Sequence, residues 1–184
     1  MKIENLETLD KQYSIVYADP PWMQKKGGKK NVRPNSSGGE LEYPTLTMGE
    51  IEAILRKVKT NSKHNFFMWT IEKYLLKAEE MMKSMGYKVH ARIIWNKVTG
   101  MPTAFTVRYQ HEYLLWCYKK GKILMPVKEE QGEWGDVFTE QVRRHSQKPE
   151  HAYEMIEAMF PDVEKIELFA RNTRNGWDCW GNEV

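Results

Sequence analysis

Four consecutive residues, Asp19-Pro20-Pro21-Trp22, combine groups that can hold and activate a flat aromatic amine. The Asp19 carboxylate and the Pro20 carbonyl are hydrogen-bond acceptors, and two acceptors that converge on the N–H groups of such an amine localise its lone pair on nitrogen. The prolines fix their φ angles and bring no competing N–H, which suits rigid positioning. Trp22 offers a flat face on which a base can stack. We therefore predict Asp19, Pro20, Pro21 and Trp22 to be the catalytic residues.

A structural role is the alternative interpretation of the same four residues. Asp19 would then cap nearby amides of a rigid turn, and Trp22 would fill the core. The position of the motif favours chemistry, because Tyr13–Ala18 is an apolar run typical of a buried strand that ends at Asp19. Ligands of open α/β sheets bind beyond the carboxyl ends of such strands.

A basic segment follows the motif within a stretch rich in Gly, Ser, Asn and Pro, at about residues 23–43. We predict this stretch to be a flexible active-site loop whose cations contact nucleic-acid phosphates, and a merely solvated loop is the alternative. The net charge of +3 is too small for binding by charge alone. The predicted phosphate contacts are Lys25, Lys26, Lys29, Lys30, Arg33, Arg143 and Arg144, with Arg108 as a weaker candidate.

Strand-like and helical patterns alternate along the chain and predict an α/β fold with a mostly parallel sheet and helices on both faces. Gly121 predicts a turn that joins strand 113–118 to residues 123–125 as an antiparallel hairpin at the sheet edge. We expect a single domain over residues 1–184, because no linker or repeat is visible. The other expected strands are 13–18, 65–69, 87–95 and 165–170, and the expected helices are about 47–61, 75–85 and 149–160.

Several classes of protein are disfavoured by the composition. The two cysteines and five histidines lack the spacing of a metal site, so we predict no metal. No apolar run approaches the roughly 18 residues that span a membrane, and the N-terminus lacks the pattern of a secretory signal. We therefore expect a cytoplasmic protein with no membrane partner.

The chain resembles the adenine-specific DNA and RNA methyltransferases of the MT-A type, typified by the catalytic subunit of the eukaryotic messenger-RNA adenosine methyltransferase. It looks like a small bacterial or phage member of that family. The resemblance covers nearly the whole chain and implies a Rossmann-like methyltransferase fold. Besides the Asp19–Trp22 motif it is carried by Tyr43-Pro44-Thr45-Leu46, Phe67-Met68-Trp69-Thr70, Ile94-Trp95-Asn96-Lys97, His111-Glu112-Tyr113, Ser146-Gln147-Lys148-Pro149, Lys165 to Arg171, and Gly181-Asn182.

This resemblance implies methylation of the N6 amine of adenine in DNA with S-adenosylmethionine as the cofactor. RNA is the alternative substrate, and an inactive nucleic-acid-binding subunit of a methyltransferase complex is the alternative role. By this resemblance Asp19 contacts the amino group of the cofactor and Lys148 its carboxylate. The ribose is contacted by Arg171, Asn182 and Glu183, and the adenine by Ile3. Glu167 is a further implied cofactor contact. The expected state is a monomer or homodimer, with a partner subunit as a further possibility.

Overall fold

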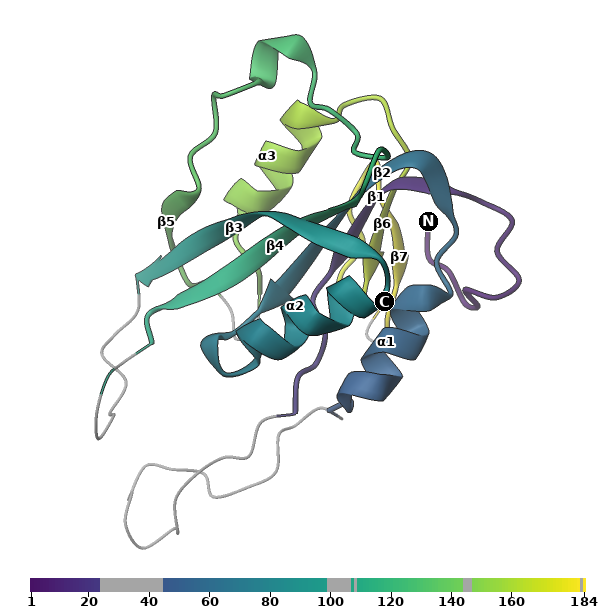
Figure 1. Ribbon diagram of the computed structural model, residues 1–184, viewed down its shortest axis with the longest axis horizontal. Helices are drawn as coiled ribbons and strands as arrows, with labels where there is room; N and C mark the ends of the chain where they lie inside the picture. The colour runs from purple at the N-terminus through teal and green to yellow at the C-terminus, as the bar shows by residue number, and fades with distance from the viewer. Residues whose placement is uncertain (24–44, 99–106, 108, 144–146, 183) are drawn as a thin grey trace, which may run out of the picture.

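A seven-stranded sheet forms the centre of the computed structural model, which describes residues 1–23, 45–98, 107, 109–143, 147–182 and 184 (Figure 1). The strand order is β5-β3-β4-β2-β1-β6-β7. The strands are β1 (Tyr13–Ala18), β2 (Thr60–Thr70), β3 (Tyr87–Val98), β4 (His111–Lys119), β5 (Val137–Gln141), β6 (Lys165–Leu168) and β7 (Asp178–Trp180). The helices are α1 (Met48–Arg56), α2 (Leu75–Ser84) and α3 (Glu150–Met159), with short 3-10 turns η1 (Glu72–Tyr74) and η2 (Lys128–Glu130).

Strand β4 runs against the direction shared by the other six strands. It is antiparallel to both of its neighbours, β2 and β3, whereas β1 pairs in parallel with β2 and β6, and β3 pairs in parallel with β5. The first residues of β4 therefore lie at the edge of the sheet where the other strands end. This brings Glu112, near the start of β4, to the same edge as Asp19, which follows β1.

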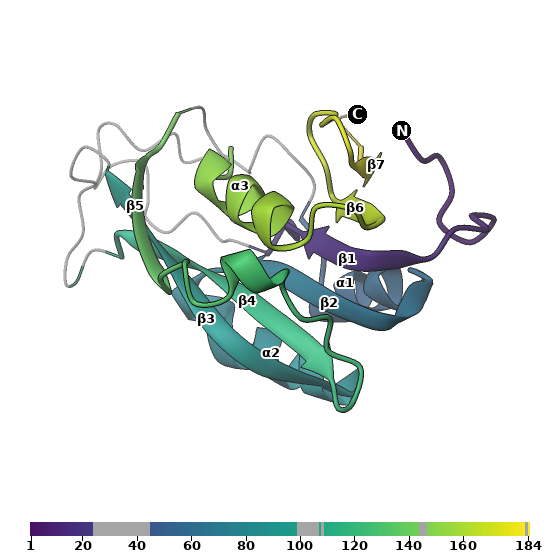
Figure 2. The same cartoon turned by 90° about the horizontal axis from the view of Figure 1, so that it is seen from above.

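Two apolar cores lie on opposite faces of the sheet, and Figure 2 shows α3 on one face and α1 with α2 on the other. Side chains of a strand alternate between its faces, so Val16 and Ala18 pack with α1 and α2 while Ile15 and Tyr17 pack with α3. The alternation continues into Asp19, which belongs to the α3 side. None of the described helices exceeds ten residues, so none is long and apolar enough to cross a membrane.

The predicted mixed α/β fold with a mostly parallel sheet and helices on both faces is confirmed. The strand 13–18 ends where expected, before Asp19. Gly86 follows α2 with a φ of +85°, a conformation that glycine adopts without a steric penalty. Pro149 caps the start of α3.

The predicted antiparallel hairpin at the sheet edge is wrong. Residues 123–125 form no strand, although Gly121 makes the expected turn. Both sides of β4 are already paired with β2 and β3, so no edge is left for a further strand. The main chain of Leu124 instead bonds to the side chain of Asn65, with the Asn65 Nδ2 donating to the Leu124 carbonyl at 2.8 Å.

One helix boundary and two short strands also differ from the sequence prediction. Helix α1 ends at Arg56 rather than near residue 61, because the chain has to enter β2 at Thr60, which pairs with Tyr13 of β1. The strands β5 and β7 were not predicted. They have five and three residues and lie at the two ends of the strand order, where a short strand gives little periodic signal.

We predict that Met82→Ala lowers the free energy of unfolding by about 2–5 kcal/mol, because Met82 is fully buried between α2 and the sheet. Leu76→Ala is the matched control, since Leu76 lies on the same helix with 74% of its surface exposed, and it should change stability by less than about 0.5 kcal/mol. Urea unfolding of both variants measures this difference. Equal losses would contradict the assignment of this helix face to the core.

Candidate active site

Asp19 occupies the carboxyl end of the central strand β1 and keeps 20% of its side chain exposed. Its backbone N–H donates to the carbonyl of Leu168 on the neighbouring strand β6 at 3.4 Å. Its carboxylate lies 3.0 Å from the ammonium of Lys148, just before α3. The ion pair therefore joins the end of β1 to the beginning of the helix that covers this face.

Lys148 is the second of four alternating charges, after Asp19. Its Nζ also lies 2.7 Å from a carboxylate oxygen of Glu112 on β4, and the second oxygen of Glu112 lies 2.9 Å from Nζ of Lys97 on β3. The ammonium of Lys148 further lies 5.2 Å from the centre of the Trp69 ring, a cation–π contact. Side chains from β1, β2 and β4 thus converge on one mostly buried cation.

The pKa values of these groups follow from burial and from their neighbours. Burial raises the pKa of the Asp19 carboxyl, Lys148 offsets part of that rise and Glu112 adds to it. Burial would also raise the pKa of Glu112, but Lys148 and Lys97 outweigh it and lower that pKa below the ordinary value. Burial would lower the pKa of Lys148, yet the two carboxylates raise it to about 12. Lys148 therefore stays charged at neutral pH, and Asp19 binds a proton more readily than an ordinary aspartate.

The backbone of the Asp19–Trp22 motif is fixed on both sides. The Trp22 N–H donates to the Pro20 carbonyl at 2.8 Å, and the Leu46 N–H donates to the Pro21 carbonyl at 3.0 Å. A carbonyl oxygen has two lone pairs, so Pro20 can accept a second hydrogen bond. The motif consequently presents a carboxylate and a carbonyl with spare acceptor capacity at one end of the sheet.

The expected free stacking face of Trp22 is not present in this structure. The Trp22 ring is 5% exposed, donates from Nε1 to the Trp69 carbonyl at 3.1 Å and is stacked on Tyr74 with centroids 5.4 Å apart. The Tyr74 hydroxyl in turn donates to the Met23 carbonyl. Here Trp22 anchors the motif in the core between α2 and the sheet, as the structural interpretation of that residue predicts.

Glu167 lies beside this site on β6, with 8% of its surface exposed. The Tyr153 hydroxyl of α3 donates to it at 2.9 Å. Burial raises the pKa of Glu167 to about 7, the Tyr153 hydrogen bond lowers it and Asp19 adds to the rise. A neighbouring pair, Trp69 Nε1 and the Tyr17 hydroxyl at 2.5 Å, completes the polar layer under Asp19.

The segment after β6 is strained and tightly packed against the end of the chain. Phe169 has a φ of +61°, which is rare for a residue with a side chain and costs on the order of 1–3 kcal/mol. A Cβ on Gly181 would lie 2.2 Å from the Ala170 carbonyl oxygen, so only glycine fits there. This close approach places Arg171 and Asn182, each next to one of these residues, at the same edge of the sheet.

The remaining predicted site residues fall into two groups. Ile3 is buried and its N–H donates to the Cys179 carbonyl at 2.8 Å, so the N-terminal segment lies beside β7. Arg143 lies 3.5 Å from Glu140 and 3.6 Å from Glu150 on the surface. Lys25, Lys26, Lys29, Lys30, Arg33, Arg108, Arg144 and Glu183 lie outside the described residues.

Three residues at this edge were not assigned to the site from the sequence. Glu112 and Lys97 were noted only as parts of family motifs, and their convergence on Lys148 depends on the reversed direction of β4. Thr70, at the end of β2, has a buried hydroxyl without a hydrogen-bond partner among the described residues. Buried polar groups are normally paired, so this hydroxyl is available to a ligand at the catalytic edge.

The chain is similar to several known methyltransferases. The model of the MT-A70 family matches residues 13–183. The type II methyltransferase M.MunI of Mycoplasma sp. is 32% identical over an alignment that covers 95% of this chain and 78% of that protein. The human N(6)-adenosine-methyltransferase catalytic subunit METTL3 is 30% identical, and a putative N(6)-adenosine-methyltransferase of Medicago truncatula is 28% identical. The alignments with these two cover 94% of this chain but only 28% and 26% of their own lengths.

We predict that Glu167→Gln removes a pH-dependent loss of stability. Between its ordinary pKa of 4.5 and about 7 the unfolded chain has released the Glu167 proton while the folded protein retains it, so wild-type stability falls as pH rises. The stability of Glu167→Gln relative to wild type should rise by roughly 3 kcal/mol across that window and stay constant above it. Urea unfolding at pH 4.5 to 8 measures the difference. A difference that does not vary with pH would contradict the raised pKa.

Proposed function

The chain belongs to the MT-A70 family, and on that basis we propose that it transfers a methyl group from S-adenosylmethionine to the N6 amine of adenine in DNA. The observation that supports this most strongly is the Asp19 carboxylate held by Lys148 beside the Pro20 carbonyl. Two acceptors at the end of a central strand are what the amine of adenine needs, because its two N–H groups can each donate to one of them.

The residues around Asp19 fit the charges of S-adenosylmethionine, which carries an ammonium, a carboxylate and a sulfonium. The ammonium would be held by Asp19 and the carboxylate by Lys148, which is cationic at neutral pH. Arg171 and Asn182 would contact the ribose, and Ile3 would pack near the adenine, with Glu167 below them. The close approach of Gly181 to the Ala170 backbone, where a Cβ would clash, brings the neighbouring Arg171 and Asn182 close together. When bound there, the cofactor supplies an activated methyl group.

The chain's own residues would then do three things to the substrate. Asp19 and the Pro20 carbonyl accept hydrogen bonds from the amine and so direct its nitrogen lone pair away from the purine ring. Trp22 and Tyr74 hold the Pro20–Pro21 turn rigid, which preserves the alignment of the reacting atoms. Asp19 or water takes the proton that the nitrogen releases after methylation, and the raised pKa of Asp19 suits it as the acceptor.

DNA is the proposed substrate because a bacterial type II methyltransferase is matched over 78% of its own length. A duplex substrate would need the adenine flipped out of the stack, at a cost of a few kcal/mol. The basic residues between Lys25 and Arg33 remain the proposed phosphate contacts. RNA is the second candidate, because the eukaryotic relatives are named N(6)-adenosine-methyltransferases.

A methyl-transfer assay tests this proposal. We expect tritium from labelled S-adenosylmethionine to enter DNA oligonucleotides, and nucleoside analysis of the product to yield N6-methyldeoxyadenosine. RNA oligonucleotides of the same sequence, whose product would be N6-methyladenosine, are assayed in parallel. The nucleic acid that is methylated faster is the substrate. Cofactor binding without transfer to either nucleic acid would contradict the enzymatic proposal and favour an inactive binding subunit.

We predict that Asp19→Asn lowers kcat by about 10²–10³-fold, because the amide keeps the shape of the side chain but loses the negative charge that polarises the amine. Asp162→Asn is the control, since this exposed carboxylate precedes β6 at the opposite edge of the sheet, and it should keep full activity. Unfolding curves of both variants check that the fold is retained. Near-wild-type turnover by folded Asp19→Asn would rule out the proposed role of the carboxylate.

A further inference from the structure

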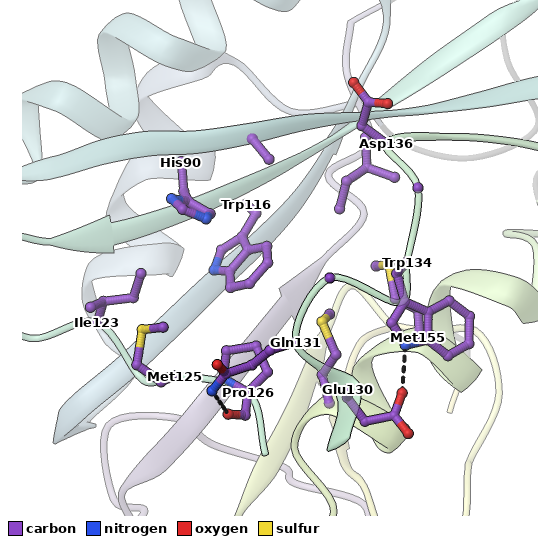
Figure 3. A pocket seen from close by; sticks show the side chains of 15 residues that line it. His90, Trp116, Ile123, Met125, Pro126, Glu130, Gln131, Trp134, Asp136 and Met155 are labelled. Atoms are coloured by element: carbon purple, nitrogen blue, oxygen red, sulfur yellow. Dashed lines mark hydrogen bonds between the residues drawn. The ribbon is translucent and has the colours of Figure 1, made fainter. Parts of the chain in front are cut away.

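A pocket that is separate from the candidate active site lies on the α3 side of the sheet (Figure 3). It has a volume of about 270 Å³ and is enclosed by strands β3 and β4, by α3 and by the segment that joins β4 to β5. None of its lining residues belongs to the Asp19–Lys148 site. Trp116, in its wall, is four residues beyond Glu112 along β4, or about 13 Å at the rise of a strand.

Trp116 carries a buried hydrogen-bond donor that has no partner. Its side chain is 9% exposed, and its Nε1 is, with the Thr70 hydroxyl, one of two such orphaned side-chain atoms among the residues that the structure describes. An unpaired indole N–H inside a protein costs about 1–3 kcal/mol, and a tryptophan that only fills a core usually finds a partner for it. Figure 3 shows the indole nitrogen turned toward the side of the pocket where His90, Ile123 and Met125 lie.

The walls of the pocket favour a flat and largely apolar occupant. Trp116 and Trp134 supply aromatic faces, and Met125, Met155 and Met159 supply thioethers, which contact aromatic rings favourably. The volume is slightly below the roughly 300–1,000 Å³ of pockets for drug-sized ligands, so it suits a molecule of two fused rings.

The polar groups of the rim define the charge of that molecule. Glu130 and Asp136 are acidic and disfavour an anion, and the described residues that line the pocket include no lysine or arginine. Glu130 is held in place because Trp134 Nε1 donates to it at 2.7 Å, and Gln131 is held by its bond to the Pro126 carbonyl at 3.0 Å. The side chains of Trp134 and Gln131 thus form hydrogen bonds within the pocket wall, whereas the Trp116 N–H is available to a ligand.

We propose that this pocket is a binding site for an uncharged planar heteroaromatic molecule of fused-ring size, whose ring nitrogen accepts a hydrogen bond from Trp116 Nε1. Because the ligand needs an acceptor nitrogen, the pocket should bind this class more tightly than aromatic hydrocarbons or rings whose nitrogen can only donate a hydrogen bond. Met125 lines the pocket with 59% of its surface exposed, so its side chain has room to move aside as the ligand approaches the buried N–H.

Benzimidazole and indole form a matched pair of probes, because both have two fused rings and one N–H, but only benzimidazole has an acceptor nitrogen. Each is titrated into ¹⁵N-labelled protein while the indole N–H resonance of Trp116 is followed, and Trp116→Phe identifies that resonance by its absence. We expect benzimidazole to move the resonance downfield and indole to leave it nearly unchanged. Trp116→Phe should bind benzimidazole about tenfold more weakly than wild type while its affinity for indole stays the same.

Two results would overturn the proposal. One is a Trp116 resonance that benzimidazole at millimolar concentration does not move. The other is indole binding that equals benzimidazole binding in the wild-type protein, because the pocket would then select for shape alone. The wild-type titration decides even if Trp116→Phe folds poorly, and neither readout depends on methyl transfer.

Discussion

The ion pair between Asp19 and Lys148 is the interaction on which the site depends. A carboxylate at the end of a central strand loses most of its hydration, and a buried charge is tolerated only when an opposite charge and further hydrogen bonds compensate it. Lys148 provides that charge from the segment before α3, and Glu112 and Lys97 hold Lys148 in turn. Breaking the pair would leave an uncompensated charge at the position where the proposed mechanism needs an oriented acceptor.

The reversed direction of β4 makes this arrangement possible. In a purely parallel sheet, Glu112 would lie at the amino-terminal edge, far from Asp19. With β4 inserted between β2 and β3, its first residues lie beside the ends of those two strands, and β1 is the next strand after β2. A carboxylate 93 positions after Asp19 therefore joins the same cluster. The opposite side of the site is shaped by the strained Phe169 and by Gly181, where only the absence of a Cβ lets the last turn approach Ala170. Such backbone strain commonly accompanies functional sites.

Local sequence patterns predicted the elements whose formation depends mainly on residues close together in the chain. The apolar run before Asp19 predicted β1 and its end, and the helical spacing of apolar residues predicted α2 and α3. The signals did not locate β5 and β7, which are short, or the interior position of β4, which depends on pairing between distant strands. The burial of Trp22 likewise depends on Tyr74, 52 positions away. Lys148 was identified only through a family resemblance, because a single lysine before a proline is ordinarily a solvated helix-start residue.

The pKa of the Asp19 carboxyl, measured by ¹³C NMR in wild-type protein and in Lys148→Met, tests this account most directly. Burial raises that pKa and Lys148 holds part of the rise in check, so the account predicts a wild-type value above that of an ordinary aspartate and a still higher value in the folded variant. The acid limb of the pH profile for methyl transfer should move to higher pH together with it. An Asp19 pKa that is unchanged by the loss of the Lys148 ammonium would show that the two groups are not coupled and would contradict the account.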